Sequence, residues 1–474
     1  MRTPPAPAPD LRVDGTAWDV VVVGAGNAAL VSAIAAAETG CRVLVLERAP
    51  AALRGGNTRH TRNIRCVHAA ADAYNSGSYL FDELWDDLCR VGEGPSNEKL
   101  AEITVRLSEE AVPWLTERGV RWQQPLHGTL QLGRTNRFFL GGGKALVNAH
   151  HRTLRRLGVA VAYDATVDEL VVTGDRCTGL RGTQAGAGFA VTAGAVVCAC
   201  GGFEANIAWL RRYWGDAADN YIIRGPRYND GRVLANLYDL GAARAGQERG
   251  FHAIAVDARA PKFDGGIATR LDTVPFSIVV NRTAERFSDE GEDEWPKRYA
   301  SWGTNIAGQP GQIVYSIWDD RTAGRFLPPM YGVYRAGSLA ELAADLGLPA
   351  ARLAATVARY NAAVRPGTFD PARLDDCRTE GLDPPKSHWA LPIDRPPFYG
   401  VPMRPGITFT YLGVAVDERA RVLRTEGTPF TNVYAAGEIM SGNILSTGYL
   451  AGFGLTIGTV WGRLAGTGAG RHAG

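Results

Sequence analysis

An α/β fold made of two differently patterned parts is predicted by three features of this 474-residue sequence. Residues 19–48 run through a β-branched stretch, a glycine turn, an alanine-rich segment of helical length and a second β-branched stretch, the pattern of a β–α–β unit. Another apolar run ends in a glycine pair at 201–202, and a glycine-rich segment follows near the C-terminus. Residues 251–397 change to short mixed strands, a helical stretch and a proline-rich exit. We therefore expect a Rossmann-like domain from segments 18–250 and 398–474, with an α+β domain inserted at 251–397.

Charge and composition exclude several classes of protein. The 51 Lys and Arg residues against 49 Asp and Glu give a net charge of +2 without basic runs, so no nucleic-acid partner is expected. Stretches of ~18 apolar residues are absent, so no integral membrane segment is expected either. The seven cysteines show no metal-binding spacing, which predicts reduced thiols, no metal site and a cytoplasmic protein. The proline-rich residues 1–17 are expected to form a flexible leader.

The first glycine turn has the spacing of a dinucleotide-binding motif. Gly24 and Gly26 match the first two glycines of G-x-G-x-x-G, and Ala29 stands at the third position. A helix that begins there directs its backbone N–H groups at a pyrophosphate, which needs a close approach without a Cβ. We expect Asn27 to cap this helix and Ala28 to lie in the same phosphate site.

An acidic residue follows at the expected distance. Glu47 lies roughly 20 residues beyond Gly26, at the end of the second strand, where a carboxylate accepts hydrogen bonds from a ribose. Its neighbour Arg48 is assigned to the same site. The carboxylate disfavours NADP, whereas the motif alone does not separate FAD from NAD. A tight turn that binds nothing is the alternative interpretation.

Three further segments carry a resemblance to a known group of enzymes. They are RGGNT at 54–58, VVCACGGF at 196–203 and NVYAAGE at 432–438, the last followed by GYLAGFGLTIGTVWGRLAG. Together with the β–α–β motif they resemble the fumarate reductase and 3-ketosteroid dehydrogenase superfamily of FAD enzymes, from about residue 19 to about residue 466. The resemblance implies a cap, formed by the inserted domain, over the cofactor.

The resemblance also implies the residues that bind FAD. These are Gly55, Gly56, Asn57, Thr58, Val167, Gly201, Gly202, Gly437, Glu438, Gly454 and Leu455. Membrane-bound members carry the flavin on a histidine where Asn57 stands here, so non-covalent FAD is expected. His60 is the alternative point of covalent attachment.

Longer stretches are similar to the tricarballylate dehydrogenase branch of this superfamily. They include RGGNTRHTRNIRCVH, RTAERFSDEGEDEW and PGITFTYLGVAVD. That branch oxidises a carbon–carbon single bond of a tricarboxylate to an alkene. A basic cluster of Arg59, His60, Arg62, Arg65 and His68 suits several carboxylates, although a solvated loop or contacts with cofactor phosphates would explain it equally well.

Departures from the fumarate reductases bear on the reaction. His252 matches one carboxylate-binding histidine, but the second is missing from the segment FTYLG at 409–413. The position of the proton-donating arginine falls near Asp293 and Glu294. Fumarate reduction by that mechanism is therefore not expected.

Desaturation needs a base within hydrogen-bonding reach of the proton that leaves. The candidates are His252, Tyr399 and Tyr449, each of which would otherwise be a buried structural residue. Arg286 and Arg298 are candidate carboxylate clamps, unless they pair with Glu290 and Glu292.

The sequence therefore predicts an FAD-dependent dehydrogenase acting on a small molecule with a CH–CH bond beside a carboxylate or carbonyl. A separate protein, a quinone or oxygen would reoxidise the cofactor, because no haem or iron–sulfur cysteine pattern is present. Two alternatives stay open: a desaturase of a cyclic ketone or polyketide-type metabolite, and a non-catalytic FAD protein that relays electrons.

Overall fold

The α/β fold is confirmed by a computed structural model, which describes residues 13–94, 96–124 and 132–474. Residues 1–12 of the expected leader lie outside the described residues. Of the described residues within the expected leader, Val13 is 1% exposed, and the first strand opens at Ala17.

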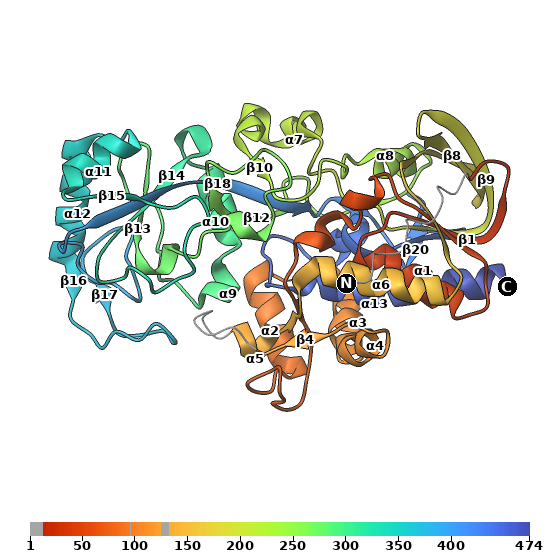
Figure 1. Ribbon diagram of the computed structural model, residues 1–474, viewed down its shortest axis with the longest axis horizontal. Coiled ribbons are helices and arrows are strands. Elements are labelled where there is room, and N and C mark those ends of the chain that lie inside the picture. Colours follow the sequence, from red (N-terminus) through yellow and green to blue (C-terminus); the bar gives the residue numbers. More distant parts are fainter. Residues whose placement is uncertain (1–12, 95, 125–131) are drawn as a thin grey trace, which may run out of the picture.

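The first sheet has eight strands among the described residues. Together with the helices around it, this sheet forms the first part of the molecule, at the right of Figure 1. Its path is β20-β21-β9-β1-β2-β6, and the hairpin β7–β8 joins it at β9. Pairings among β21, β9, β1, β2 and β6 are all parallel. The strands are β1 (Ala17–Val23), β2 (Val43–Leu46), β6 (Ala160–Ala162), β7 (Ala165–Thr173), β8 (Arg176–Gln184), β9 (Ala187–Cys198), β20 (Arg421–Leu423) and β21 (Pro429–Ala435).

Helices from both ends of the chain cover this sheet. Helix α1 (Asn27–Ala37) is buried on all sides over residues 27–36, because it lies between the sheet, α6 (Gly142–Arg156) and the C-terminal helix α13 (Phe453–Ala473). The other helices of this part are α2 (Phe81–Gly92), α3 (Glu98–Ser108), α4 (Ala111–Glu117), α5 (Leu132–Thr135), α7 (Ile207–Trp214) and α8 (Arg232–Asp239). Short strands complete it: β3 (Asn63–Arg65), β4 (Trp122–Gln123), β5 (Asn136–Phe139), β11 (Arg244–Ala245) and β19 (Gly413–Val414).

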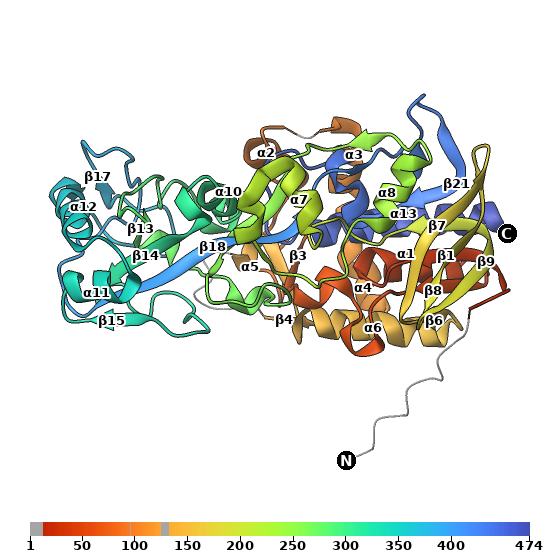
Figure 2. The ribbon, with the colours of Figure 1, turned by 90° about the horizontal axis from the view of Figure 1, so that it is seen from above.

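A second sheet of six strands lies beside the first part (Figures 1 and 2). It contains β10 (Ile222–Ile223), β12 (Phe251–Asp257), β13 (Ile278–Asn281), β14 (Val314–Asp319), β15 (Tyr334–Ala336) and β18 (Phe398–Thr410). The helices of this region are α9 (Trp295–Arg298), α10 (Ser301–Ala307), α11 (Leu339–Leu346) and α12 (Ala350–Ala363), and a small ribbon pairs β16 (Val364–Arg365) with β17 (Arg378–Thr379). Apolar residues of α11, α12 and this sheet form a separate core.

The long strand β18 connects the two parts. Its first half pairs with β14 and β15, and its second half pairs with β10 and with β12, which carries His252 opposite Phe409. Figure 1 shows β18 running from the second sheet toward the middle of the molecule. Because β10 and β18 lie outside residues 251–397, the sheet extends beyond the segment expected as the insertion, and those boundaries stay a prediction.

Two possible features are not found among the described residues. No helix of the described ranges has both the length and the apolar character that a bilayer span requires. Over the same ranges, His, Cys, Asp and Glu side chains do not gather in groups of three that would hold a metal ion.

Glycines on one face of α13 let it approach α1 closely. Gly458, Gly462, Gly466 and Gly470 recur every fourth residue, so they share one side of the helix. A Cβ on Gly466 would lie 2.2 Å from the carbonyl oxygen of Ser32, and one on Gly462 would lie 2.8 Å from that of Ala28. The two ends of the chain are therefore packed backbone against backbone.

We predict that Gly466→Ala lowers the free energy of unfolding by about 1–3 kcal/mol, since the helices must separate to admit the methyl group. This loss exceeds the free energy that the higher helix propensity of alanine would add to the stability of the folded protein. Urea denaturation measures it, with Thr467→Ala, in a surface groove, as a control expected to stay within about 0.5 kcal/mol. A Gly466→Ala protein as stable as the control would contradict the close packing.

Candidate functional site

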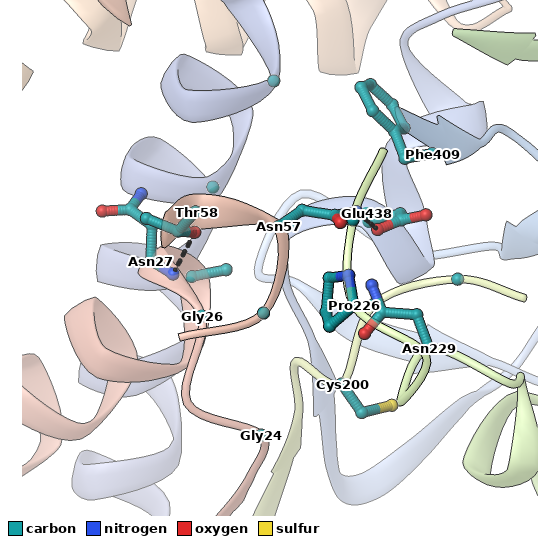
Figure 3. Close-up of a pocket in the computed structure, with 18 of the residues that line it drawn as sticks. Gly24, Gly26, Asn27, Asn57, Thr58, Cys200, Pro226, Asn229, Phe409 and Glu438 are labelled. Carbon is teal, nitrogen blue, oxygen red and sulfur yellow. Dashed lines mark hydrogen bonds between the residues drawn. The ribbon is translucent and has the colours of Figure 1, made fainter. Parts of the chain in front are cut away.

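A long cleft lies at the carboxyl ends of the parallel strands, where open α/β sheets bind ligands. Residues that directly follow β1, β2, β9 and β21 line it, as do residues from the second sheet and Tyr299, which directly follows α9. Figure 3 shows Gly24, Gly26 and Asn27 on one side of the cleft and Phe409 and Glu438 on the other. The cleft is therefore built from segments far apart in the sequence.

The first glycine turn forms one end of the cleft. Gly24 has a φ of 106°, and a Cβ there would lie 2.5 Å from the carbonyl oxygen of Ala199, so only glycine fits. The cap of α1 is Gly26 rather than Asn27, which is the first helical residue and is 3% exposed. The backbone N–H of Asn27 donates to Thr58 Oγ1 at 2.8 Å, and its amide nitrogen donates to Thr459 Oγ1 at 3.0 Å.

A glycine at the N-cap of α1 suits a phosphate better than the asparagine expected there. Gly26 has no side chain that could cap α1, and Thr58 Oγ1 accepts from the N–H of Asn27, so an anion would bind the N–H groups of the residues that follow in the first turn. The helix start lies at the floor of the cleft, which suits a pyrophosphate.

The acidic residue expected to bind a ribose faces the same cleft. Glu47 directly follows β2, is 6% exposed, and accepts a hydrogen bond of 2.7 Å from Ala49 N–H. Burial, only partly offset by that N–H, raises the pKa of Glu47 to about 7. Arg48 is paired with Asp230 at 2.6 Å, and Val167, in β7, lines the cleft as well.

Nearly all the other residues expected to bind the cofactor also line this cleft. They are Ala28, Gly56, Asn57, Thr58, Gly201, Gly202, Gly437, Glu438, Gly454 and Leu455. Gly55 does not, because it packs on α6, where an added Cβ would lie 2.8 Å from Val147 Cγ2.

A buried carboxyl pair lies beside Asn57, and one of its members was not expected from the sequence. Asn57 Nδ2 donates to Glu204 Oε1 at 2.8 Å and to Glu438 Oε2 at 3.3 Å, and Asn229 Nδ2 donates to Glu204 Oε1 at 2.7 Å. Burial, followed by the charge of Glu204, raises the pKa of Glu438 well above its usual range. Two such carboxyls cannot both ionise easily. The signal for Glu204 was its place directly after the glycine pair and Phe203.

Unsatisfied polar atoms show that this part of the cleft suits a polar ligand. Asn57 Oδ1 and Ser441 Oγ are buried without a hydrogen-bond partner, and both residues line the cleft. Buried polar groups in folded proteins are nearly always paired, so these atoms suit the polar groups of a bound cofactor. The site fits a dinucleotide in four respects. It has glycines along its floor, a helix start whose cap residue has no side chain, an acidic residue at the position expected for the ribose, and buried polar atoms that lack partners.

His252 lies at the far end of the cleft among aromatic rings. Its ring stacks on Tyr449 with 3.7 Å between centroids, and Phe409 meets it edge-on. Nε2 lies 3.5 Å from the hydroxyl of Tyr299, at the outer limit of hydrogen bonding, whereas Nδ1 has no partner. Burial, then the nearby Arg224 and Arg270, lowers the pKa of His252 well below its usual value. The imidazole is therefore neutral at neutral pH.

Three arginines face this end of the cleft. Arg62, Arg224 and Arg270 line it together with His252. Arg270 pairs with Asp272, whereas none of the ion pairs formed by described residues involves Arg62 or Arg224. Arg224 Nη1 donates to Thr408 Oγ1 at 2.5 Å, but Arg224 Nε and Arg62 Nη2 are buried without a hydrogen-bond partner in the part of the chain that the structure describes. Burial, with the charge of Arg270 added, lowers the pKa of both guanidinium groups to about 10, so they stay charged.

Asp272, which pairs with Arg270, also acts electrostatically on Arg62, so one carboxylate serves two of these guanidinium groups. Buried excess positive charge is rare, because desolvation costs several kcal/mol per ion. This end of the cleft is therefore a site for an anion. Arg62 belongs to the basic cluster expected from the sequence. Arg224 and Arg270 have no local motif, since Arg224 directly follows β10 and Arg270 lies in the segment after β12.

Several residues assigned to the site from the sequence lie elsewhere. The hydroxyl of Tyr399 approaches Asp320 at 3.4 Å and its ring stacks on Trp318. Arg286 forms a buried pair with Glu290 at 2.5 Å, and Arg298 pairs with Glu292. Arg59 donates to the carbonyl oxygen of Leu53, Arg65 to that of Ala451, and His68 contacts two backbone carbonyls. None of these side chains is among those that line the cleft, whereas His60 and Tyr449 are.

Comparisons with known proteins agree with this geometry. The family model described as "FAD binding domain" matches residues 19–455. NADH:fumarate oxidoreductase of Klebsiella pneumoniae (strain 342) is 26% identical over 90% of this chain and 44% of that protein. 4-Oxocyclohexanecarboxylate 2-dehydrogenase of Sinomonas cyclohexanicum is 27% identical over 96% of this chain and 94% of that protein. The chain spans about half the length of the first curated relatives it matches, 44% and 50%.

Solved structures share the fold. The open conformation of a flavocytochrome c3 fumarate reductase has a TM-score of 0.73 at 22% identity, covering 97% of this chain and 79% of that one. The 3-ketosteroid-Δ4-(5α)-dehydrogenase of Rhodococcus jostii RHA1 also has a TM-score of 0.73, at 23% identity, covering 96% and 97%. These likenesses support the fold in which the cleft is formed.

The raised pKa of Glu47 predicts that FAD affinity depends on pH. The ionised carboxylate accepts hydrogen bonds from ribose hydroxyls, so a protonated Glu47 must lose its proton before FAD binds. We expect the Kd of FAD to rise as the pH falls below about 7, by up to about tenfold per pH unit, since the free protein holds that proton. Isothermal titration calorimetry of the apoprotein between pH 5.5 and 8.5 measures this.

Glu47→Gln supplies the comparison. We expect it to weaken FAD binding at pH 8 by about 10–100-fold, through loss of charged hydrogen bonds, and to remove the pH dependence. Glu38→Gln, which alters an exposed pair with Arg118 at the end of α1, should behave like the unmodified protein. A pH dependence that persists in Glu47→Gln would contradict the assignment.

Proposed function

The chain belongs to the FAD binding domain family, and on this premise we propose that it is an FAD-dependent dehydrogenase for a carboxylate-bearing small molecule. The proposed reaction oxidises a CH–CH bond next to a carboxylate or carbonyl to an alkene. A tricarballylate-like polycarboxylate is the favoured substrate. The FAD is held without a covalent bond, because Asn57 and not a histidine stands at the start of η2 (Gly56–His60).

The observation that carries this proposal is the unpaired charge of Arg62 and Arg224 beside His252. Two guanidinium groups without carboxylate partners suit two carboxylates of one substrate, each in a charge-assisted hydrogen bond. Arg270, which is already paired with Asp272, adds positive potential. A neutral ring ketone would leave both charges unpaired in a closed site.

The protein residues have separate tasks in the proposed reaction. Bound FAD supplies the two-electron acceptor for the hydride that leaves one carbon. Arg62 and Arg224 hold the carboxylates, which fixes the adjacent carbon against the imidazole. His252 Nδ1 has no hydrogen-bond partner among the described residues and, in the neutral ring, accepts the proton from that carbon while Nε2–H points to the Tyr299 oxygen. Tyr449 stacks on the ring and keeps it in place.

A ring substrate remains the second candidate because of the wall of aromatic side chains formed by Tyr299, Phe409 and Tyr449 around His252. The full-length relative that acts on 4-oxocyclohexanecarboxylate is named for a compound with both a ring ketone and a carboxylate. Such a substrate would use the arginines as well. In either case, a separate electron acceptor reoxidises the cofactor.

An anaerobic screen tests the proposal by following the bleaching of the flavin absorbance. Three classes are compared: tricarboxylates, cyclohexanone carboxylates, and neutral cyclic ketones that include steroids. We expect bleaching with carboxylate-bearing compounds only, because neutral ketones leave Arg62 and Arg224 without counter-charge. Bleaching by neutral ketones alone would overturn the proposed substrate class.

Two variants test the catalytic role in the same screen. His252→Ala should keep its FAD and slow the bleaching by about 10²–10⁴-fold, because the base is lost. Tyr399→Phe, far from the cleft, should bleach at the rate of the unmodified protein. A His252→Ala protein with unchanged rates for every substrate would favour an electron-relay protein instead.

A further inference from the structure

A buried carboxylate connects the two parts of the molecule next to the cleft. Asp87, in α2, is 4% exposed and accepts hydrogen bonds from Tyr79 O–H at 2.7 Å and from Arg90 at 3.2 Å. Lys297 Nζ lies 2.9 Å from its Oδ1, and Arg65 Nη1 lies 3.8 Å from its Oδ2. We call these five residues the Asp87 cluster. Figure 1 shows α2, from the first part, next to α9, from the second.

One arm of the Asp87 cluster leads to Tyr299. Lys297 lies in α9, two residues before Tyr299, and its side chain is 14% exposed. The other anchor of α9 is Trp295, whose indole N–H donates to Asp272 Oδ1 at 2.6 Å within the second part. The pair of Lys297 with Asp87 therefore ties the segment that carries Tyr299 to the part that carries the FAD site.

The other arm leads to Tyr449. Arg65 is fully buried, donates through Nη1 to the Tyr79 oxygen at 2.8 Å and through Nε to the Ala451 carbonyl at 3.0 Å. Ala451 follows Tyr449 by two residues, and the loop is held tightly because a Cβ on Gly452 would lie 3.0 Å from Arg65 N. Tyr79 therefore relays the position of Asp87 to this loop.

The two tyrosines flank His252 from different segments. Tyr449 stacks on its ring and the Tyr299 hydroxyl approaches Nε2. We propose that Asp87 is a positioning residue, whose carboxylate holds the segments of Tyr299 and Tyr449 in register around His252. Its catalytic consequence rests on the proposed function, whereas the mechanical link does not.

The electrostatics of the Asp87 cluster support this role. Burial alone would raise the pKa of Asp87, but the hydrogen bonds from Lys297 and Tyr79 outweigh it and hold that pKa below its usual range. The carboxylate is thus ionised and serves Lys297, Arg90 and Arg65 at once. Removal of its charge would leave the buried Arg65 without a carboxylate among the described residues and would leave Lys297 only its longer pair with Glu294, at 3.6 Å, so both arms would loosen.

Hydrogen–deuterium exchange of the FAD-loaded protein without substrate tests the mechanical link. Lys297→Met should raise exchange at residues 295–300 by about tenfold, and Tyr79→Phe should do the same at residues 449–452, because each change opens one arm. Asp87→Asn should loosen both segments. Lys297→Arg, which keeps the ion pair, and Lys99→Met, which removes an exposed lysine, should match the unmodified protein.

Steady-state kinetics with a substrate found in the screen test the catalytic half. We expect Lys297→Met to lower kcat about tenfold with less than about a threefold change in KM, because the arginines stay in place while the alignment at His252 is lost. Lys297→Arg should restore kcat. If Asp87→Asn does not fold, Lys297→Met and Tyr79→Phe decide the outcome separately.

Each result has a definite meaning. Exchange in Lys297→Met and Tyr79→Phe equal to that in Lys99→Met would overturn the proposal. Faster exchange with unchanged kcat would overturn the positioning role. If no compound bleaches the unmodified protein, the proposed function fails, and the exchange data alone then decide whether Asp87 links the two parts.

Discussion

The unpaired charge of two arginines is the constraint on which the account of the site depends. Arg62 and Arg224 bring guanidinium groups to one end of a cleft, and none of the ion pairs among described residues involves them. Desolvation of these two charges destabilises the free protein, and a bound anion offsets this penalty. Because His252 faces the same space, the anion that relieves the charge is held beside a neutral proton acceptor.

The fold brings these groups together from distant parts of the chain. Glycines let α13 pack directly on α1, so the C-terminal helix lies against the start of the helix that follows the first glycine turn. Strand β18 places His252, in β12, opposite Phe409, and the loop after β10 brings in Arg224. The cleft depends on this long-range register more than on any local motif.

The sequence predicted the parts of the site that have local spacing. The β–α–β pattern, Glu47 and the glycine pairs could be read from neighbouring residues, and the structure places them in one cleft. Arg224, Arg270 and Tyr299 could not, because their roles arise only when the second sheet lies beside the first. For Arg286 the sequence left a carboxylate clamp and a pair with Glu290 open, and the structure shows the pair; Tyr399, a candidate base, stacks on Trp318 outside the cleft.

Binding of a polycarboxylate beside Arg62 and Arg224 can be measured by titration, before any turnover. The flavin difference spectrum of the oxidised FAD protein is recorded with tricarballylate and with its trimethyl ester, for the unmodified protein and for Arg224→Met. We expect the acid to bind and the ester not to bind, and we expect Arg224→Met to weaken binding of the acid by about 2–4 kcal/mol, roughly 30–1,000-fold. Equal binding of acid and ester, or acid binding unaffected by Arg224→Met, would contradict the account.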